Sequence, residues 1–159
     1  METGAKVNIL LVDDQPARLL TYQTVLSELG QNLVTARSGV EALEQLMREE
    51  FAVVLLDVSM PGMDGFETAH LIHTHPRYER TPIIFVTGVH VTELDRLNGY
   101  KLGAVDYVSI PVVPEILRSK VAVLVELHQR RSELLEVNRA LNAARPAFHL
   151  LLSSSASSK

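Results

Sequence analysis

The chain has 159 residues, 47% of them hydrophobic, which suits one domain with a sizeable core plus some further sequence. Its net charge of -4 and the absence of Lys- or Arg-rich runs argue against binding to nucleic acid or to an anionic membrane. It contains no cysteine, which excludes disulfides, thiolate zinc sites and a cysteine nucleophile, and it shows neither a bilayer-spanning stretch nor a secretory signal, so we expect a cytoplasmic protein.

The first 125 residues alternate between apolar runs typical of buried strands and stretches typical of helices. The predicted strands are Val7–Val12, Asn32–Ala36, Ala52–Asp57, Pro82–Thr87 and Val105–Val108, and the predicted helices are Pro16–Leu29, Val40–Glu50, Gly65–Thr74 and Val91–Leu102. Ser38 and Glu41 form a capping box for the second helix, while Gly30 and Gly103 end the first and fourth. Short loops between alternating strands and helices predict an α/β fold with a parallel sheet covered on both faces.

A last helix begins at Pro114 and is predicted to run to about Ala143, with Pro146 ending it. We expect three parts: a globular domain over residues 1–125, a helical extension over residues 126–145, and a flexible Ser-rich tail over residues 146–159. A three-and-four spacing that resembles a short parallel dimeric coiled coil is formed by Leu124, Leu127, Arg131, Leu134, Asn138 and Leu141. Either this helix pairs with a second copy as a homodimer, or it packs on its own domain and then frays.

Acidic residues follow two of the predicted strands. Asp57 ends the apolar run Phe51–Leu56, and Asp13 and Asp14 directly follow Val7–Val12. The carboxyl ends of parallel strands meet at one edge of a sheet, so we expect the three carboxylates to lie close together. Two charges 4 Å apart repel by roughly 4 kcal/mol at an effective dielectric of about 20, so the cluster must take up protons or bind a cation.

Oxygen ligands without cysteine favour a hard ion, Mg²⁺ above all. A carboxylate beside Mg²⁺ can attack a phosphoryl group and become an acyl phosphate. Thr87 and Gly88 end another predicted strand and offer a hydroxyl and an amide as hydrogen-bond donors. The residues therefore predict a phosphoryl-accepting site at this edge of the sheet.

The motifs together resemble the receiver domain of bacterial two-component response regulators, from about Val7 to Val125. The resemblance is carried by Asp13-Asp14, Asp57-x-x-Met-Pro-x-Met-Asp-Gly, Thr87-Gly88, Gly103-Ala-x-Asp-Tyr107 and Pro111. It implies a flavodoxin-like (βα)5 fold, a doubly wound parallel sheet in the strand order 2-1-3-4-5, here with an extended C-terminal helix. It also implies a regulatory domain rather than an enzyme, with at most slow autodephosphorylation.

The resemblance further implies a role for each motif residue. Asp57 would accept the phosphoryl group from a histidine kinase or a histidine phosphotransfer domain. Asp14 would ligate Mg²⁺ directly, Asp13 would act through water, and the backbone carbonyl of Ser59 would be a further ligand.

Three residues on the later strands also receive roles from the resemblance. Thr87 would hydrogen-bond the phosphoryl group, with the Gly88 amide beside it. Tyr107 would be the aromatic side chain that swings inward on phosphorylation, although a packing role is also open. Pro111 would follow a cis peptide bond.

One residue departs from the family pattern: Ile110 stands where the family has a lysine before the proline. Some receivers attached to hybrid sensor histidine kinases carry an aliphatic residue here, and this stretch is similar to theirs. The alternative function is therefore a pseudo-receiver that binds proteins without efficient phosphotransfer. A haloacid-dehalogenase-type hydrolase would need an aspartate where Ser59 stands. We expect a module of a longer sensor kinase, or else a single-domain regulator.

Overall fold

The computed structural model describes residues 4–88, 97, 101 and 104–157 of the chain. Its strands are β1 (Asn8–Val12), β2 (Asn32–Ala36), β3 (Val53–Asp57), β4 (Ile83–Thr87) and β5 (Ala104–Ser109), and its helices are α1 (Pro16–Leu26), α2 (Gly39–Arg48), α3 (Gly65–Thr74) and α5 (Pro114–Ser157). The helix predicted over Val91–Leu102 and its end at Gly103 lie almost wholly outside the described residues. Apart from the end of the last helix, the other predicted elements form within a few residues of their expected bounds.

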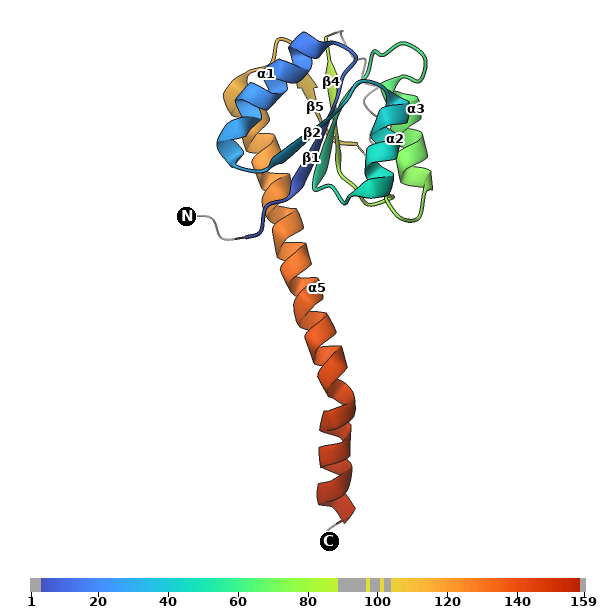
Figure 1. Ribbon diagram of the computed structural model, residues 1–159, viewed down its shortest axis with the longest axis vertical. Coiled ribbons are helices and arrows are strands. Elements are labelled where there is room, and N and C mark those ends of the chain that lie inside the picture. The colour runs from blue at the N-terminus through green and yellow to red at the C-terminus, as the bar shows by residue number, and fades with distance from the viewer. Residues whose placement is uncertain (1–3, 89–96, 98–100, 102–103, 158–159) are drawn as a thin grey trace. The chain divides into compact units, whose positions relative to one another are not determined.

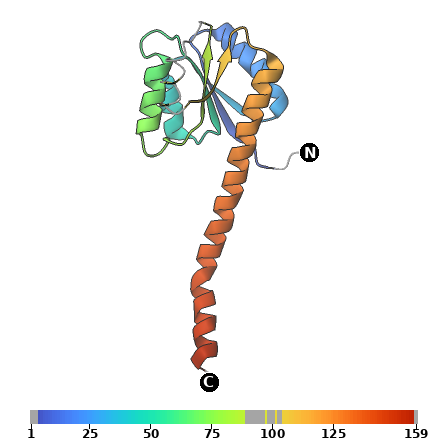
Figure 2. The same ribbon diagram turned by 180° about the vertical axis from the view of Figure 1, so that it is seen from behind.

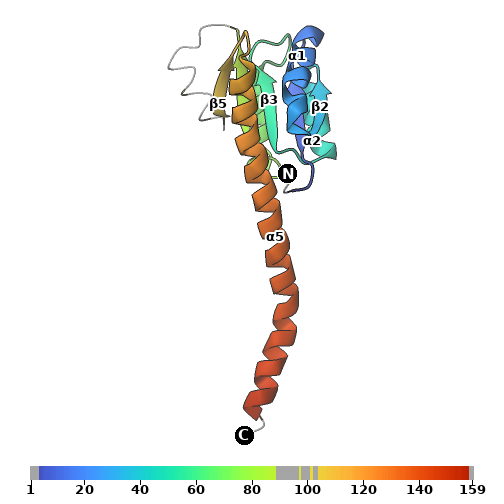
Figure 3. The same ribbon diagram turned by 90° about the vertical axis from the view of Figure 1, so that its left-hand side faces the viewer.

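The five strands form one parallel sheet in the order β2-β1-β3-β4-β5, which confirms the α/β, flavodoxin-like fold. Figure 3 shows β2 and β5 on opposite sides of β3. Because β1 and β3 pair in register, from Ile9 with Val53 to Val12 with Leu56, their carboxyl ends lie side by side. The residues that follow these two strands are thereby brought to the same edge of the sheet.

Two apolar clusters hold helices on opposite faces of this sheet. On one face, Leu19 and Tyr22 of α1 and Leu117 and Val121 of α5 pack on the strands. On the other face, the strands are covered by α2 and α3 (Figures 1 and 2). β3 is buried along its whole length, as its unbroken apolar sequence predicts for a central parallel strand.

The starts of α2 and α3 show how side chains satisfy free backbone donors. The Ser38 hydroxyl accepts the Glu41 N–H at 3.1 Å, and the Asp64 carboxylate accepts the Glu67 N–H at 2.8 Å. The Glu41 carboxylate accepts from the Arg37 N–H at 2.7 Å, one residue earlier than the predicted capping box requires. Both loops that lead into these helices are therefore anchored locally.

The chain divides into two compact units, Met1–Val125 and Glu126–Lys159. The prediction that Pro146 ends the last helix is wrong, because α5 continues through Pro146 to Ser157. A proline inside a helix lacks one N–H donor and its ring crowds the carbonyl four residues earlier. Residues 141–146 are exposed, so the freed carbonyl is open to water. The division at residue 146 into a helical extension and a flexible tail stays a prediction.

No helix in the described ranges combines the length and the apolar character needed to cross a lipid bilayer.

Candidate functional site

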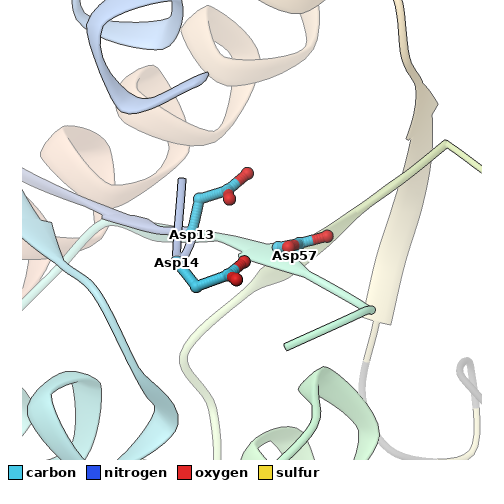
Figure 4. Close-up of side chains that lie close together, drawn as sticks. All are labelled: Asp13, Asp14 and Asp57. Carbon is cyan, nitrogen blue, oxygen red and sulfur yellow. The ribbon is translucent and has the colours of Figure 1, made fainter. Parts of the chain in front are cut away.

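The three predicted carboxylates converge where β1 and β3 end. Asp13 and Asp14 follow β1, Asp57 is the last residue of β3, and Figure 4 shows the three carboxyl groups close together. One oxygen of each carboxylate lies within 4.8 Å of one oxygen of each of the others. Asp13 and Asp57 are buried and Asp14 is half-buried. The parallel register therefore produces the cluster that the sequence predicts.

Asp13 is held by hydrogen bonds to both of its oxygens. The Gln15 N–H donates to Asp13 Oδ1 at 2.9 Å, and the buried Tyr22 hydroxyl donates to Asp13 Oδ2 at 2.8 Å. Burial, followed by the hydrogen bond to Asp13, raises the pKa of the Tyr22 phenol. Tyr22 therefore remains a neutral donor that fixes the orientation of the Asp13 carboxylate.

Asp14 has one oxygen that nothing satisfies. Asp14 Oδ1 is buried and has no hydrogen-bond partner among the described residues. A buried carboxylate oxygen left without a donor is costly. This oxygen is therefore suited to a cation.

Asp57 is almost fully buried, at 1% exposure, and burial is the main reason that its pKa rises to about 7. The negative charge of Asp13 raises the pKa further, while the Ser59 N–H and the Arg18 guanidinium act in the opposite direction. The Ser59 N–H donates to Asp57 Oδ1 at 3.3 Å. Near neutral pH this carboxylate therefore lies close to its midpoint of ionisation when no cation is bound.

A glycine allows the loop after Asp57 to fold closely over the end of β3. A Cβ atom on Gly65 would lie 2.3 Å from the Asp57 carbonyl oxygen and 2.8 Å from Val58 Cα, both of them backbone atoms. The Gly65 N–H donates to the Val58 carbonyl at 3.0 Å. Any larger residue at position 65 would push α3 away from the acidic cluster.

Two further predicted site residues lie at the end of β4, the strand beside β3: Thr87 is its last residue and Gly88 follows it. Asp57 pairs with Val86 in the sheet, so Thr87 lies one residue further along β4 than the partner of Asp57. Thr87 is buried, whereas Gly88 is exposed. Both lie at the edge of the sheet that carries the carboxylates.

Tyr107 lies on β5, opposite Phe85 of β4. The centroids of the two rings are 5.4 Å apart, and Tyr107 is half-buried against the core on the α2 and α3 face. Its packing is therefore evident, and its role as a moving switch stays a prediction.

Ile110 follows β5 and packs against the core on the α1 and α5 face. Its N–H donates to the Thr87 carbonyl at 2.9 Å, and the peptide bond between Ile110 and Pro111 is cis, as the resemblance implies. Position 110 thus brings an aliphatic side chain, and no charge, to the strand end beside Thr87.

Sequence reasoning missed two residues of this site, Arg18 and Tyr22. Arg18 Nη1 lies 3.5 Å from Asp57 Oδ2 and 3.6 Å from Asp13 Oδ2. The available signal was the position of Arg18 in the first turn of the helix that begins just after Asp14. Tyr22 lies one helical turn further on, which makes it a buried neighbour of the same strand end.

Comparison with known proteins agrees with this geometry. The family model described as response regulator receiver domain matches residues 9–122. The chain is 38% identical over 139 residues to a probable cyclic di-GMP phosphodiesterase of Vibrio cholerae, an alignment that covers 87% of this chain and 31% of that protein. It is 32% identical over 119 residues to the histidine-protein kinase BarA of Escherichia coli K12, covering 74% and 13% respectively. The chain spans a third or less of the length of these two relatives.

Solved structures show the same fold. The chemotaxis protein CheY4 of Vibrio cholerae superposes with a TM-score of 0.71 at 29% identity, over 76% of this chain and 99% of that one. The signal receiver domain of a histidine kinase from Syntrophus aciditrophicus gives 0.68 at 28% identity, over 76% and 90%. The family match, the strand order and the three converging carboxylates lead to one conclusion: the chain belongs to the response regulator receiver domain family of two-component signalling.

Proposed function

We propose that Asp57 accepts a phosphoryl group from a histidine kinase or a histidine phosphotransfer domain, so that the chain is a phosphoryl-accepting regulatory domain. The observation that carries this proposal is the convergence of Asp13, Asp14 and Asp57 at the ends of β1 and β3. The match to the receiver family and to the histidine-protein kinase BarA supports the choice of phosphoryl donor.

The residues present fit a magnesium ion. Three carboxylates supply only oxygen ligands, and Asp14 Oδ1 is buried without a partner among the described residues. We assign direct ligation to Asp14 and Asp57 and to the Ser59 carbonyl, with Asp13 acting through water because its oxygens already accept from Tyr22 and Gln15. Bound Mg²⁺ would supply positive charge to the carboxylates and to the incoming phosphoryl oxygens.

The reaction uses the Asp57 carboxylate as a nucleophile. A lone pair on one of its oxygens forms the new bond to phosphorus while the bond from phosphorus to the donor's imidazole nitrogen breaks. The electron pair of the broken bond returns to the imidazole, which takes up a proton from solvent. The product is an acyl phosphate on Asp57. Slow attack by water on phosphorus would release inorganic phosphate and regenerate the carboxylate.

Residues on β4 and β5 would respond to the product. We assign the Thr87 hydroxyl and the Gly88 amide as hydrogen-bond donors to the phosphoryl oxygens, because both lie one strand away from Asp57. Tyr107 would move inward as Thr87 is drawn toward the phosphoryl group. In both assignments these residues form no covalent bond and transfer no proton; they only position hydrogen-bond donors or move a side chain.

A pseudo-receiver is the second candidate, and Ile110 favours it. An aliphatic side chain at this strand end supplies no charge to a phosphoryl group on Asp57. On this reading the domain binds a partner protein through its fold alone. Efficient labelling of Asp57 by a donor kinase would eliminate this candidate.

Intact mass after incubation with acetyl phosphate and Mg²⁺ tests the proposal. We expect one phosphoryl adduct on the wild-type chain and none on Asp57→Asn. The matched control is Asp64→Asn, which alters a carboxylate of the same loop but keeps a side-chain acceptor at the N-cap of α3. Asp64→Asn should be labelled like the wild type. A wild-type chain that gains no adduct, or an adduct that persists in Asp57→Asn, would refute phosphoryl acceptance at Asp57.

A further inference from the structure

Arg18 brings a positive charge to the acidic site. It lies in the first turn of α1, and its Nη1 atom is 3.5 Å from Asp57 Oδ2 and 3.6 Å from Asp13 Oδ2. Both carboxylates are buried, whereas the Arg18 side chain is 30% exposed. The guanidinium thus reaches from the solvent-accessible side of α1 to the reactive carboxylate.

Among the residues that the structure describes, the cation that forms an ion pair with Asp57 is Arg18. Directly after β5 stands the aliphatic Ile110, which packs on the same face of the sheet as α1. Positive charge for a group on Asp57 therefore comes from α1 rather than from the end of β5.

Phosphorylation increases the need for this charge. An unmodified carboxylate carries one negative charge. In the acyl phosphate this charge is replaced by about -1.5 to -2 on a phosphoryl group with three acceptor oxygens. A guanidinium presents five N–H donors in a planar fork, so Arg18 can contact a phosphoryl oxygen while still facing Asp13. Arginine side chains stabilise the charge that develops during phosphoryl transfer in other proteins.

We propose that the Arg18 guanidinium binds the phosphoryl group on Asp57 and promotes its transfer, and that in the unmodified protein it opposes Mg²⁺ binding. The proposal rests on the proposed function, because it needs Asp57 to be the acceptor. The opposition to Mg²⁺ follows from the contacts of Arg18, which reach oxygens of two of the carboxylates that would surround the metal. Arg18 thus favours the phosphorylated state over the metal-bound unmodified state.

The two parts of the proposal predict opposite effects of one substitution. In Arg18→Gln, the rate of labelling by acetyl phosphate at saturating Mg²⁺ should fall about ten- to a hundredfold, the loss typical of one charge-assisted hydrogen bond in the transition state. The same substitution should tighten Mg²⁺ binding several-fold, measured by isothermal titration calorimetry, because a positive charge has left the site. Arg18→Lys should recover part of the labelling rate.

Arg118→Gln is the matched control. Arg118 Nε pairs with Glu28 Oε2 at 3.4 Å, and its side chain is 26% exposed, close to the value for Arg18. We expect Arg118→Gln to leave both labelling and Mg²⁺ affinity at the wild-type level. Thermal unfolding followed by circular dichroism checks that each variant is folded.

Three outcomes would overturn the proposal, and they differ from one another. Labelling of Arg18→Gln at the wild-type rate shows that Arg18 does not act on the phosphoryl group. Loss of labelling and of Mg²⁺ affinity together shows a purely structural role. Absence of label on the wild-type chain rejects phosphoryl acceptance by Asp57 itself, and the assignment of Arg18 with it.

Discussion

Asp57 is buried beside two other carboxylates, and these two features determine its pKa. Its pKa rises to about 7, first because burial disfavours the charged form and then because Asp13 lies nearby. In the unfolded chain the same carboxyl group has the ordinary, much lower pKa. Between these two pKa values the folded state holds a proton that the unfolded state releases, so folding stability falls as the pH rises from about 4 to about 7.

Asp57→Asn should remove this pH dependence in the metal-free protein. An amide has nearly the same shape as the carboxyl group but no charge, so the variant avoids the cost of a buried carboxylate. At pH 8 with EDTA we expect it to exceed the wild type in free energy of unfolding by about 1–3 kcal/mol, and at pH 4 by much less. Urea unfolding at both pH values measures the difference. A gain that is equal at pH 4 and pH 8 would contradict the assignment of the pKa.

At the scale of elements, α5 changes character along its length. Leu117, Val121 and Val125 are buried against the sheet. Beyond Val125, the leucines at the second position of each predicted heptad, Leu127, Leu134 and Leu141, are 60 to 63% exposed. Apolar side chains that recur at this spacing and remain exposed are typical of a helix that pairs with another helix. We therefore propose a homodimer through this helix, formed by a second copy of the chain.

Charged residues at these positions should dissociate such a dimer. In Leu134→Glu with Leu141→Glu, sedimentation equilibrium should give the monomer mass where the wild type gives twice that mass. The matched control is Ser132→Glu with Ala140→Glu, which adds the same charge away from the heptad positions and should remain dimeric. A monomeric wild type at all concentrations would exclude the dimer.

At the scale of the whole molecule, the acidic site joins two strands that are far apart in sequence. The carboxylates that follow β1 and that end β3 repel one another in the folded state and separate on unfolding. A cation that binds all of them therefore binds the folded state alone and stabilises it by mass action. Folding and metal binding are thus linked in this domain.

Magnesium should raise the thermal stability of the folded protein. At a concentration ten times the dissociation constant, the gain is about 1.4 kcal/mol, or a few degrees in Tm. Asp14→Asn should lose most of this gain, because it removes the charge of the carboxylate whose oxygen has no partner. Asp106→Asn, whose carboxylate pairs with Lys120 on β5 and α5, should keep it. Differential scanning calorimetry with and without MgCl₂ measures both, and equal shifts in Asp14→Asn and the wild type would exclude the site.

Much of this domain follows from local sequence. Apolar runs ending in acidic residues identified β1 and β3, and their alternation with helices predicted a parallel sheet. The strand order came from the resemblance to receiver domains, and the structure has that order. Ser38 marked the start of α2 because side-chain capping depends on residues only three positions apart. The prediction that Pro146 ends the last helix was wrong, because an exposed helix tolerates the loss of one hydrogen bond.

By itself the sequence determined the fold, the edge of the sheet that carries the chemistry, and the three carboxylates, since strand periodicity and strand-end position are local properties of the chain. Only the tertiary structure revealed that Arg18 and Tyr22 reach into the same cluster, that one oxygen of Asp14 is left unsatisfied, and that Asp57 has a raised pKa. The physical reason is that charge pairing and desolvation depend on distances and burial across elements. These distances and this burial depend on how α1 packs against the sheet, and no spacing along the chain encodes them directly.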